Sequence, residues 1–197
     1  MITNFSSFLG KWIWARNLNP QYGVQSISYG IEILIRGLIK LIVILAIGLL
    51  LDNIFLPLLA GVSFGLLRVF SGGYHAKTFT KCLLISSFII YSSVILSIVM
   101  TENLSSLMGY IVIVAASLLT FTLIARFGPK ITKRVYIIDN RSIFKKRALL
   151  IVIFGTILSL CFFSIYPNVS LTIQFAMAFQ SLSLINNNQN RTQEEIK

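Results

Sequence analysis

Long apolar runs separated by short polar stretches dominate this chain. Six of them approach the roughly 20 residues that a helix needs to cross a bilayer. They are residues 31–51, 54–70, 83–100, 107–125, 148–166 and 169–185. The first carries charged residues near its start and the second contains a proline, so either of these two could be tilted or partly re-entrant. The pattern predicts an all-α polytopic membrane protein with about six transmembrane helical segments.

The N-terminal stretch, residues 1–18, has a different pattern. Its apolar residues recur at helical spacing, with serine and basic residues on the other faces, and it is too short and too polar to span a membrane. We expect an amphipathic helix in the headgroup region, where Trp12 and Trp14 suit the interface. A helix packed on the protein body is the alternative. Residues 1–185 then form a single membrane-embedded domain, and 186–197, rich in Asn and Gln, form a polar flexible tail.

Composition supports the membrane assignment and leaves little room for a separate soluble module. Hydrophobic residues make up 56% of the 197 residues and charged residues only 12%, with a mean hydropathy of +0.83. A soluble domain carries about a quarter charged residues. The chain is therefore predicted to be an integral membrane protein.

The net charge of +11 is distributed unevenly along the chain. Connections 52–53, 101–106 and 167–168 contain no Lys or Arg, whereas the connections on the other side contain many. By the positive-inside rule, both termini and the loop around residue 75 face the cytoplasm. Much of the positive charge then reflects topology, so we expect anionic lipid or an acidic peptide as partner and no nucleic acid.

Residues 68–82 interrupt the apolar pattern and hold the groups with the clearest chemistry. His75 is the only histidine and Cys82 is one of two cysteines. An imidazole that accepts a thiol proton produces a thiolate nucleophile, so this pair suggests acyl transfer. On a straight helix seven residues span about 10 Å, so the backbone must bend, and Gly72 and Gly73 permit a reversal. A purely structural role for both residues is the alternative.

Other residues support more than one interpretation. Glu32 could pair with Arg36 one turn on, or it could orient His75. Arg68 could bind substrate carboxylates or lie at the headgroups, and the two glycines could bind an oxyanion or only form a turn. Lys77 adds positive charge to the same loop.

Residues 126–147 form the most basic stretch of the chain. They contain Arg126, Lys130, Lys133, Arg134, Arg141, Lys145, Lys146 and Arg147 against one acidic residue, Asp139. This stretch either anchors the topology at anionic lipid or attracts an acidic substrate segment. A single histidine excludes a zinc site built from several, and we expect no metal and no cofactor. Cys161 lies in an apolar run and is predicted to be buried.

The loop motif resembles that of a known family. Arg68, Gly72, Gly73, His75, Ala76 and Cys82, an early Tyr29-Gly30-x-Glu32 element, the amphipathic N-terminus and the basic loop are together similar to the accessory gene regulator B (AgrB) family. These bacterial proteins are quorum-sensing membrane peptidases. The resemblance covers most of the chain.

The resemblance implies a cysteine endopeptidase in the bacterial cell membrane, acting as a homodimer on a short AgrD-like propeptide. Cys82 would be the nucleophile and His75 its base in removing the acidic C-terminal tail. The propeptide's own thiol would then resolve the acyl-enzyme to a cyclic thiolactone, the autoinducing peptide. Two alternatives remain open. A small-peptide or ion transporter would depend on Glu32, Arg36 and Lys40, and a structural or lipid-binding membrane protein would depend on neither His75 nor Cys82.

Overall fold

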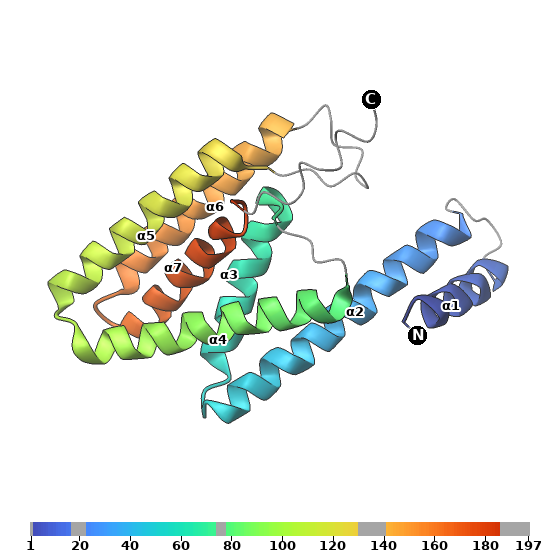
Figure 1. Cartoon of the computed structure of the whole chain (residues 1–197), viewed down its shortest axis with the longest axis horizontal. Helices are drawn as coiled ribbons and strands as arrows, with labels where there is room; N and C mark the ends of the chain where they lie inside the picture. Colours follow the sequence, from blue (N-terminus) through green and yellow to red (C-terminus); the bar gives the residue numbers. More distant parts are fainter. Residues whose placement is uncertain (1, 17–22, 74–77, 130–140, 186–197) are drawn as a thin grey trace. The chain divides into compact units, whose positions relative to one another are not determined.

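The computed structural model describes residues 2–16, 23–73, 78–129 and 141–185, and every regular element within these ranges is a helix (Figure 1). The helices are α1 (Ile2–Arg16), α2 (Val24–Leu50), α3 (Phe55–Ser71), α4 (Phe79–Asn103), α5 (Ser106–Phe127), α6 (Arg141–Phe162) and α7 (Pro167–Leu182). They divide into two compact units, Met1–Ala46 and Ile47–Lys197. The predicted all-α membrane fold is confirmed.

Each predicted apolar run falls on one helix, although the boundaries differ. The helices α2, α4 and α5 are long and apolar enough to cross a membrane, and α3 is apolar but has 17 residues. The helix α6 takes in Arg141 and the basic residues that follow it, and α7 has only 16 residues. Helix α2 begins at Val24, seven residues before the predicted run. The prediction followed apolar residues only, whereas the helix also includes the polar residues Gln25, Ser26 and Ser28.

Prolines and capping residues explain where two helices begin. Pro57 lies in the first turn of α3. Backbone N–H groups in a first turn have no partner within the helix, so a proline there costs no hydrogen bond and does not interrupt the helix. The Asn53 side chain accepts a hydrogen bond from the Leu56 N–H at 3.0 Å at the same end. Pro167 begins α7 at the position where the fixed φ of proline suits a helix start.

In the first unit, α1 presents a small-residue face toward α2. Ser6 is buried and Gly10 lies close to Ser28, where a Cβ on the glycine would collide with the serine side chain. The large apolar residues Phe5, Phe8 and Trp12 are exposed instead. An exposed apolar face of this kind is typical of a helix that lies in a membrane interface.

In the second unit, α7 lies at the centre and packs against α3, α4, α5 and α6 (Figure 1). Among the described residues, two hydrophobic clusters include side chains of α7. One is formed by Leu67, Ile124, Ala148, Val152, Met177 and Leu184, and the other by Ile113, Phe163, Leu171 and Phe175. Because α7 contributes to both clusters, its position is fixed along its whole length.

Polar side chains on α7 add hydrogen bonds to this apolar packing. Thr172 donates to the Ser97 hydroxyl on α4 at 2.7 Å, with both residues fully buried. Gln174 Nε2 donates to the Ser159 hydroxyl on α6 at 3.0 Å. Such hydrogen bonds between helices are typical of membrane proteins. Apolar side chains are equally compatible with lipid and with another helix, so polar contacts help to hold the helices together.

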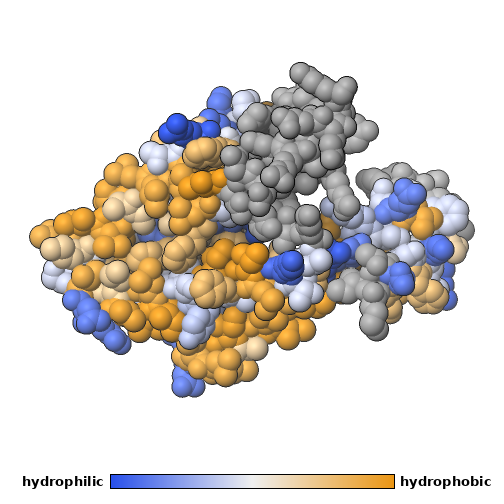
Figure 2. Space-filling model, in the orientation of Figure 1, coloured by the Kyte–Doolittle hydropathy of each residue, from blue (hydrophilic) through white to orange (hydrophobic). Residues whose placement is uncertain are grey.

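Large apolar side chains cover the outer faces of α4 and α5 (Figure 2). Leu84, Phe88 and Val99 on α4 are exposed, and so are Leu107, Ile111 and Leu118 on α5. A surface of this extent suits contact with lipid acyl chains. Cys161 on α6 is also exposed, so the prediction that it is buried was wrong. In a membrane protein an apolar run does not distinguish a core-facing residue from a lipid-facing one.

Candidate functional site

The loop that carries the predicted catalytic pair begins with a glycine turn at the end of α3. The Gly72 N–H donates to the Arg68 carbonyl at 2.9 Å and thereby caps the helix. Gly72 has φ 72° and Gly73 has φ 145°, a region that residues with a Cβ rarely adopt. The buried Ser71 hydroxyl donates to the Leu67 carbonyl at 2.7 Å. The two glycines therefore have the positive φ that the sequence analysis expected of them.

Cys82 lies in the first turn of the next helix. Thr78 is the N-cap of α4, with extended backbone, and its hydroxyl accepts a hydrogen bond from the Lys81 N–H at 3.4 Å. The Cys82 N–H donates to the Thr78 carbonyl at 3.1 Å, the first backbone bond of the helix. The thiol is half-buried. Cys82 is thus held by a capped helix start that favours nearby negative charge.

A helix far away in the sequence supports the glycine turn. Gln180, fully buried near the end of α7, donates from Nε2 to the Gly72 carbonyl at 2.7 Å. The Ser183 hydroxyl, just after α7, donates to the Gln180 carbonyl at 2.7 Å. A Cβ on Gly73 would lie 2.7 Å from Ser183 Oγ and 3.0 Å from Gln180 Nε2. Neither Gln180 nor Ser183 was predicted as a site residue, although a glutamine within an apolar run is a signal for a specific polar contact.

The beginning of α6 lies at the same end of the second unit as the glycine turn. The rings of Phe70 on α3 and Phe144 on α6 have centroids 6.2 Å apart. The ammonium group of Lys145 donates to the Ala125 carbonyl near the end of α5, while Lys146 and Arg147 are exposed. One of the predicted basic residues thus caps a helix, and two others bring positive charge to the end of the bundle where the loop begins.

Two further predicted residues have local partners. In the first unit, Arg36 and Glu32 form an ion pair one turn apart on α2, and Glu32 also lines an open groove of about 740 Å³ between α1 and α2. In the second unit, the guanidinium of Arg68 lies 5.5 Å from the centroid of the Phe64 ring on the same helix. The proposed pairing of Glu32 with Arg36 is therefore present.

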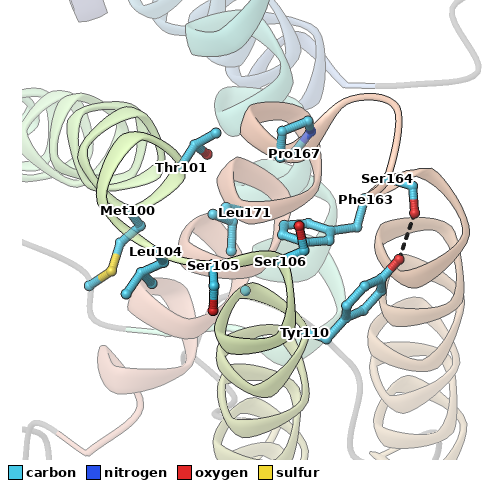
Figure 3. A pocket seen from close by; sticks show the side chains of 11 residues that line it. Met100, Thr101, Leu104, Ser105, Ser106, Tyr110, Phe163, Ser164, Pro167 and Leu171 are labelled. Carbon is cyan, nitrogen blue, oxygen red and sulfur yellow. Dashed lines mark hydrogen bonds between the residues drawn. The ribbon is translucent and has the colours of Figure 1, made fainter.

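A separate cavity of about 200 Å³ lies at the other end of α4 (Figure 3). Met100, Tyr110, Phe163 and Leu171 line it, and the Tyr110 hydroxyl lies 2.8 Å from Ser164 Oγ. Cys82 and Met100 are eighteen residues apart on one helix, about 27 Å at 1.5 Å per residue. This cavity is therefore separate from the site around Cys82.

Several predicted residues lie outside the described part of the chain. They are His75, Lys77, Lys130, Lys133 and Arg134, together with the tail 186–197. Within the described ranges, no three His, Cys, Asp or Glu side chains come together as metal ligands. The described part of the site is thus the glycine turn, the start of α4 and the end of α7.

Comparison with known proteins identifies the family. The sequence model for accessory gene regulator B matches residues 3–184, which is nearly the whole chain. This chain belongs to the AgrB family. An AgrB-like protein of Halalkalibacterium halodurans is 31% identical to it over 86 residues. That match covers 44% of this chain and 44% of the relative, so the chain spans less than half of the length of the curated relative it matches. No solved structure matches the chain.

The AgrB family is involved in the processing of quorum-sensing propeptides in a membrane setting. The family match includes the whole stretch from Arg68 to Cys82. It also includes every described helix in full, apart from Ile2, the first residue of α1. Family membership and the membrane character of the helices therefore confirm the family and the fold class that the motif implied.

Proposed function

We propose that this chain is a membrane cysteine endopeptidase that removes the C-terminal tail of an AgrD-like propeptide through an acyl-enzyme on Cys82. The observation that carries the proposal is the position of Cys82. It is a half-buried thiol in the first turn of α4, directly after the loop that contains His75, the only imidazole of the chain. Acyl transfer needs a thiol as nucleophile and a base that accepts its proton, and a helix N-terminus stabilises the thiolate. This part of the chain contains all three.

The reaction begins when His75 accepts the proton of the Cys82 thiol and the thiolate attacks the scissile carbonyl carbon. The tetrahedral intermediate collapses as the C–N bond breaks, and the imidazolium gives its proton to the departing amine. The N-terminal part of the propeptide remains on Cys82 as a thioester. The start of α4 assists because the positive end of the helix dipole favours the negative charge of the attacking sulfur.

The thioester is then exchanged within the substrate. A thiolate of the propeptide attacks the carbonyl carbon, the bond to Cys82 Sγ breaks, and the product is a cyclic thiolactone. Exchange of one thioester for another changes the free energy little, so the outcome depends on excluding water while the internal thiol reacts. The partial burial of Cys82 at one end of an apolar bundle supports such an exclusion.

The basic residues at the same end of the bundle recruit the acidic tail of the substrate. Lys146 and Arg147 are exposed near the beginning of α6, which contacts the end of α3 through Phe144 and Phe70. In this proposal Lys130, Lys133 and Arg134 extend the same positive field, which faces the cytoplasm together with the loop and both termini. The propeptide then approaches from the cytoplasmic side of the bacterial cell membrane.

Cleavage by purified protein in lipid nanodiscs tests the proposal. A candidate propeptide is incubated with the wild type, with Cys82→Ala and with Cys161→Ala, and release of the tail is followed by gel and mass spectrometry. Cys161 is the matched control because it is the other cysteine and lies exposed on α6. We expect cleavage by the wild type and by Cys161→Ala only. Equal cleavage by Cys82→Ala would exclude a cysteine-peptidase mechanism.

A further inference from the structure

Gln180 uses only one of its two amide atoms in a hydrogen bond. Its Nε2 donates to the Gly72 carbonyl at 2.7 Å, whereas its Oε1 has no hydrogen-bond partner although the side chain is fully buried. The assignment of the two atoms follows from the partner, because a carbonyl oxygen can only accept. A buried acceptor without a partner is unfavourable, and Gln174 on the same helix has one as well, so the hydrogen bond to Gly72 is what distinguishes Gln180.

The hydrogen bond from Gln180 joins two elements that are 108 residues apart in the sequence. The Gly72 carbonyl belongs to the turn that ends α3, and Gly73 fits against Gln180 Nε2 and Ser183 Oγ so closely that no Cβ has room. The glycine turn is therefore supported by α7 as well as by its own helix. The chain between Gly73 and Thr78 is short enough that the Cα atoms of these two residues lie within about 18 Å.

The helix that carries Gln180 is also the one that supports α4. Thr172 of α7 donates to Ser97 of α4, and α7 packs along both α3 and α4. The two helices that bracket the loop are thus both joined to α7, α3 at the glycine turn and α4 at Ser97, about 22 Å along the helix from Cys82. Gln180 contacts the turn where the loop begins, whereas the hydrogen bond from α7 to α4 is made by Thr172.

We propose that Gln180 is a positioning residue for the reaction at Cys82, because its amide fixes the Gly72–Gly73 turn from which the His75 loop starts. The inference rests on the proposed function. A loop that starts in the wrong place brings the base to the thiol in the wrong geometry, and a displacement of about 1 Å can reduce a rate about 100-fold. Gln180 therefore acts on the chemical step and not on the binding of the propeptide.

Gln180→Met tests the inference, with Gln174→Met as the matched control. Methionine is close to glutamine in shape and removes the donor to Gly72 together with the unpartnered acceptor, so insertion and folding should be preserved. Gln174 lies on the same helix, is equally buried and also has an unpartnered Oε1, but it donates to Ser159 and Gly155 on α6. Gln180→Asn is the second variant, because it keeps the amide but is too short to reach Gly72.

Two readouts are measured on full-length protein in nanodiscs. The first is kcat and KM for cleavage of the propeptide, and the second is the rate at which iodoacetamide alkylates Cys82 in a Cys161→Ser background. For Gln180→Met we expect kcat to fall about 10- to 100-fold and KM to change less than about threefold. The alkylation rate of Cys82 should fall as well, and Gln174→Met should resemble the wild type in both measurements.

The inference is overturned if Gln180→Met and Gln174→Met behave alike, or if Gln180→Met raises KM while kcat stays constant. Where Gln180→Met does not insert, Gln180→Asn decides by the same criteria. Failure of the proposed function gives a different result, because Cys82→Ala would then cleave as well as the wild type. In that case the alkylation rates alone decide whether Gln180 positions the loop beside Cys82.

Discussion

The rings of Phe70 at the end of α3 and Phe144 at the beginning of α6 lie 6.2 Å apart, and this contact brings the start of the loop and the basic residues of α6 to one end of the bundle. The ammonium group of Lys145 donates a hydrogen bond to a carbonyl at the end of α5. The side chains of Lys146 and Arg147 are exposed. The structure therefore separates a basic residue that contacts a helix end from two that are exposed, and in the proposed function these two attract the acidic tail of the propeptide.

Replacing both exposed residues, as Lys146→Gln with Arg147→Gln, should lower kcat/KM for a propeptide with an acidic tail by roughly tenfold. The value of kcat should change little, because the charges act on encounter and not on the thiol chemistry. The control is Lys146→Arg with Arg147→Lys, which keeps both charges. Steady-state kinetics at two salt concentrations measure the effect, which should shrink as salt rises. An equal loss in the control would show that packing and not charge is responsible.

Gly73→Ala should reduce cleavage by about 100-fold while the protein still inserts. The alanine Cβ would lie 2.7 Å from Ser183 Oγ, and the φ of 145° is strained for any residue with a Cβ. The matched control is Gly65→Ala on α3, where a Cβ meets nothing within 4 Å. Alanine is favoured over glycine in a helix by about 1 kcal/mol, so the control should be active and at least as stable as the wild type. Full activity of Gly73→Ala would contradict the described turn.

The buried bond between Thr172 and Ser97 should contribute to stability and not to catalysis. Thr172→Val removes the donor and should lower the free energy of unfolding in detergent by about 0.5–2 kcal/mol. Ser97 lies fifteen residues after Cys82 on α4, about 22 Å along the helix, so kcat at low temperature should be unchanged. A double-mutant cycle with Ser97→Ala isolates the coupling energy. A cycle without measurable coupling would show that the pair does not join α4 to α7.

The positions of the helices could be predicted because apolar runs of nearly membrane-spanning length are the strongest signal a sequence contains. The turn at Gly72 and Gly73 was predictable for a related reason, since two adjacent glycines permit the positive φ that the structure has. The ion pair of Glu32 with Arg36 follows from their spacing of one helical turn.

The sequence could not show which helix occupies the centre of the second unit. The run 169–185 was predicted as one transmembrane segment among six, yet most residues of α7 are buried whereas α5 exposes Leu107, Ile111 and Leu118. Lipid and protein core accept the same side chains, so hydropathy does not separate them. For the same reason Cys161 was wrongly predicted to be buried, and the contact of Gln180 with Gly72, 108 residues away, had no counterpart in the local pattern.

The most direct test of the central claim is a search for the acyl-enzyme itself. Wild-type protein in nanodiscs is mixed with a propeptide whose internal Cys is replaced by Ala, so that no internal thiol can release the thioester, and the protein is digested and examined by mass spectrometry. We expect the N-terminal part of the propeptide to be attached at Cys82, to be removed by hydroxylamine, and to be absent from Cys82→Ala and present in Cys161→Ala. Release of the tail by the Cys82→Ala variant, or an adduct at a residue other than Cys82, would contradict the account.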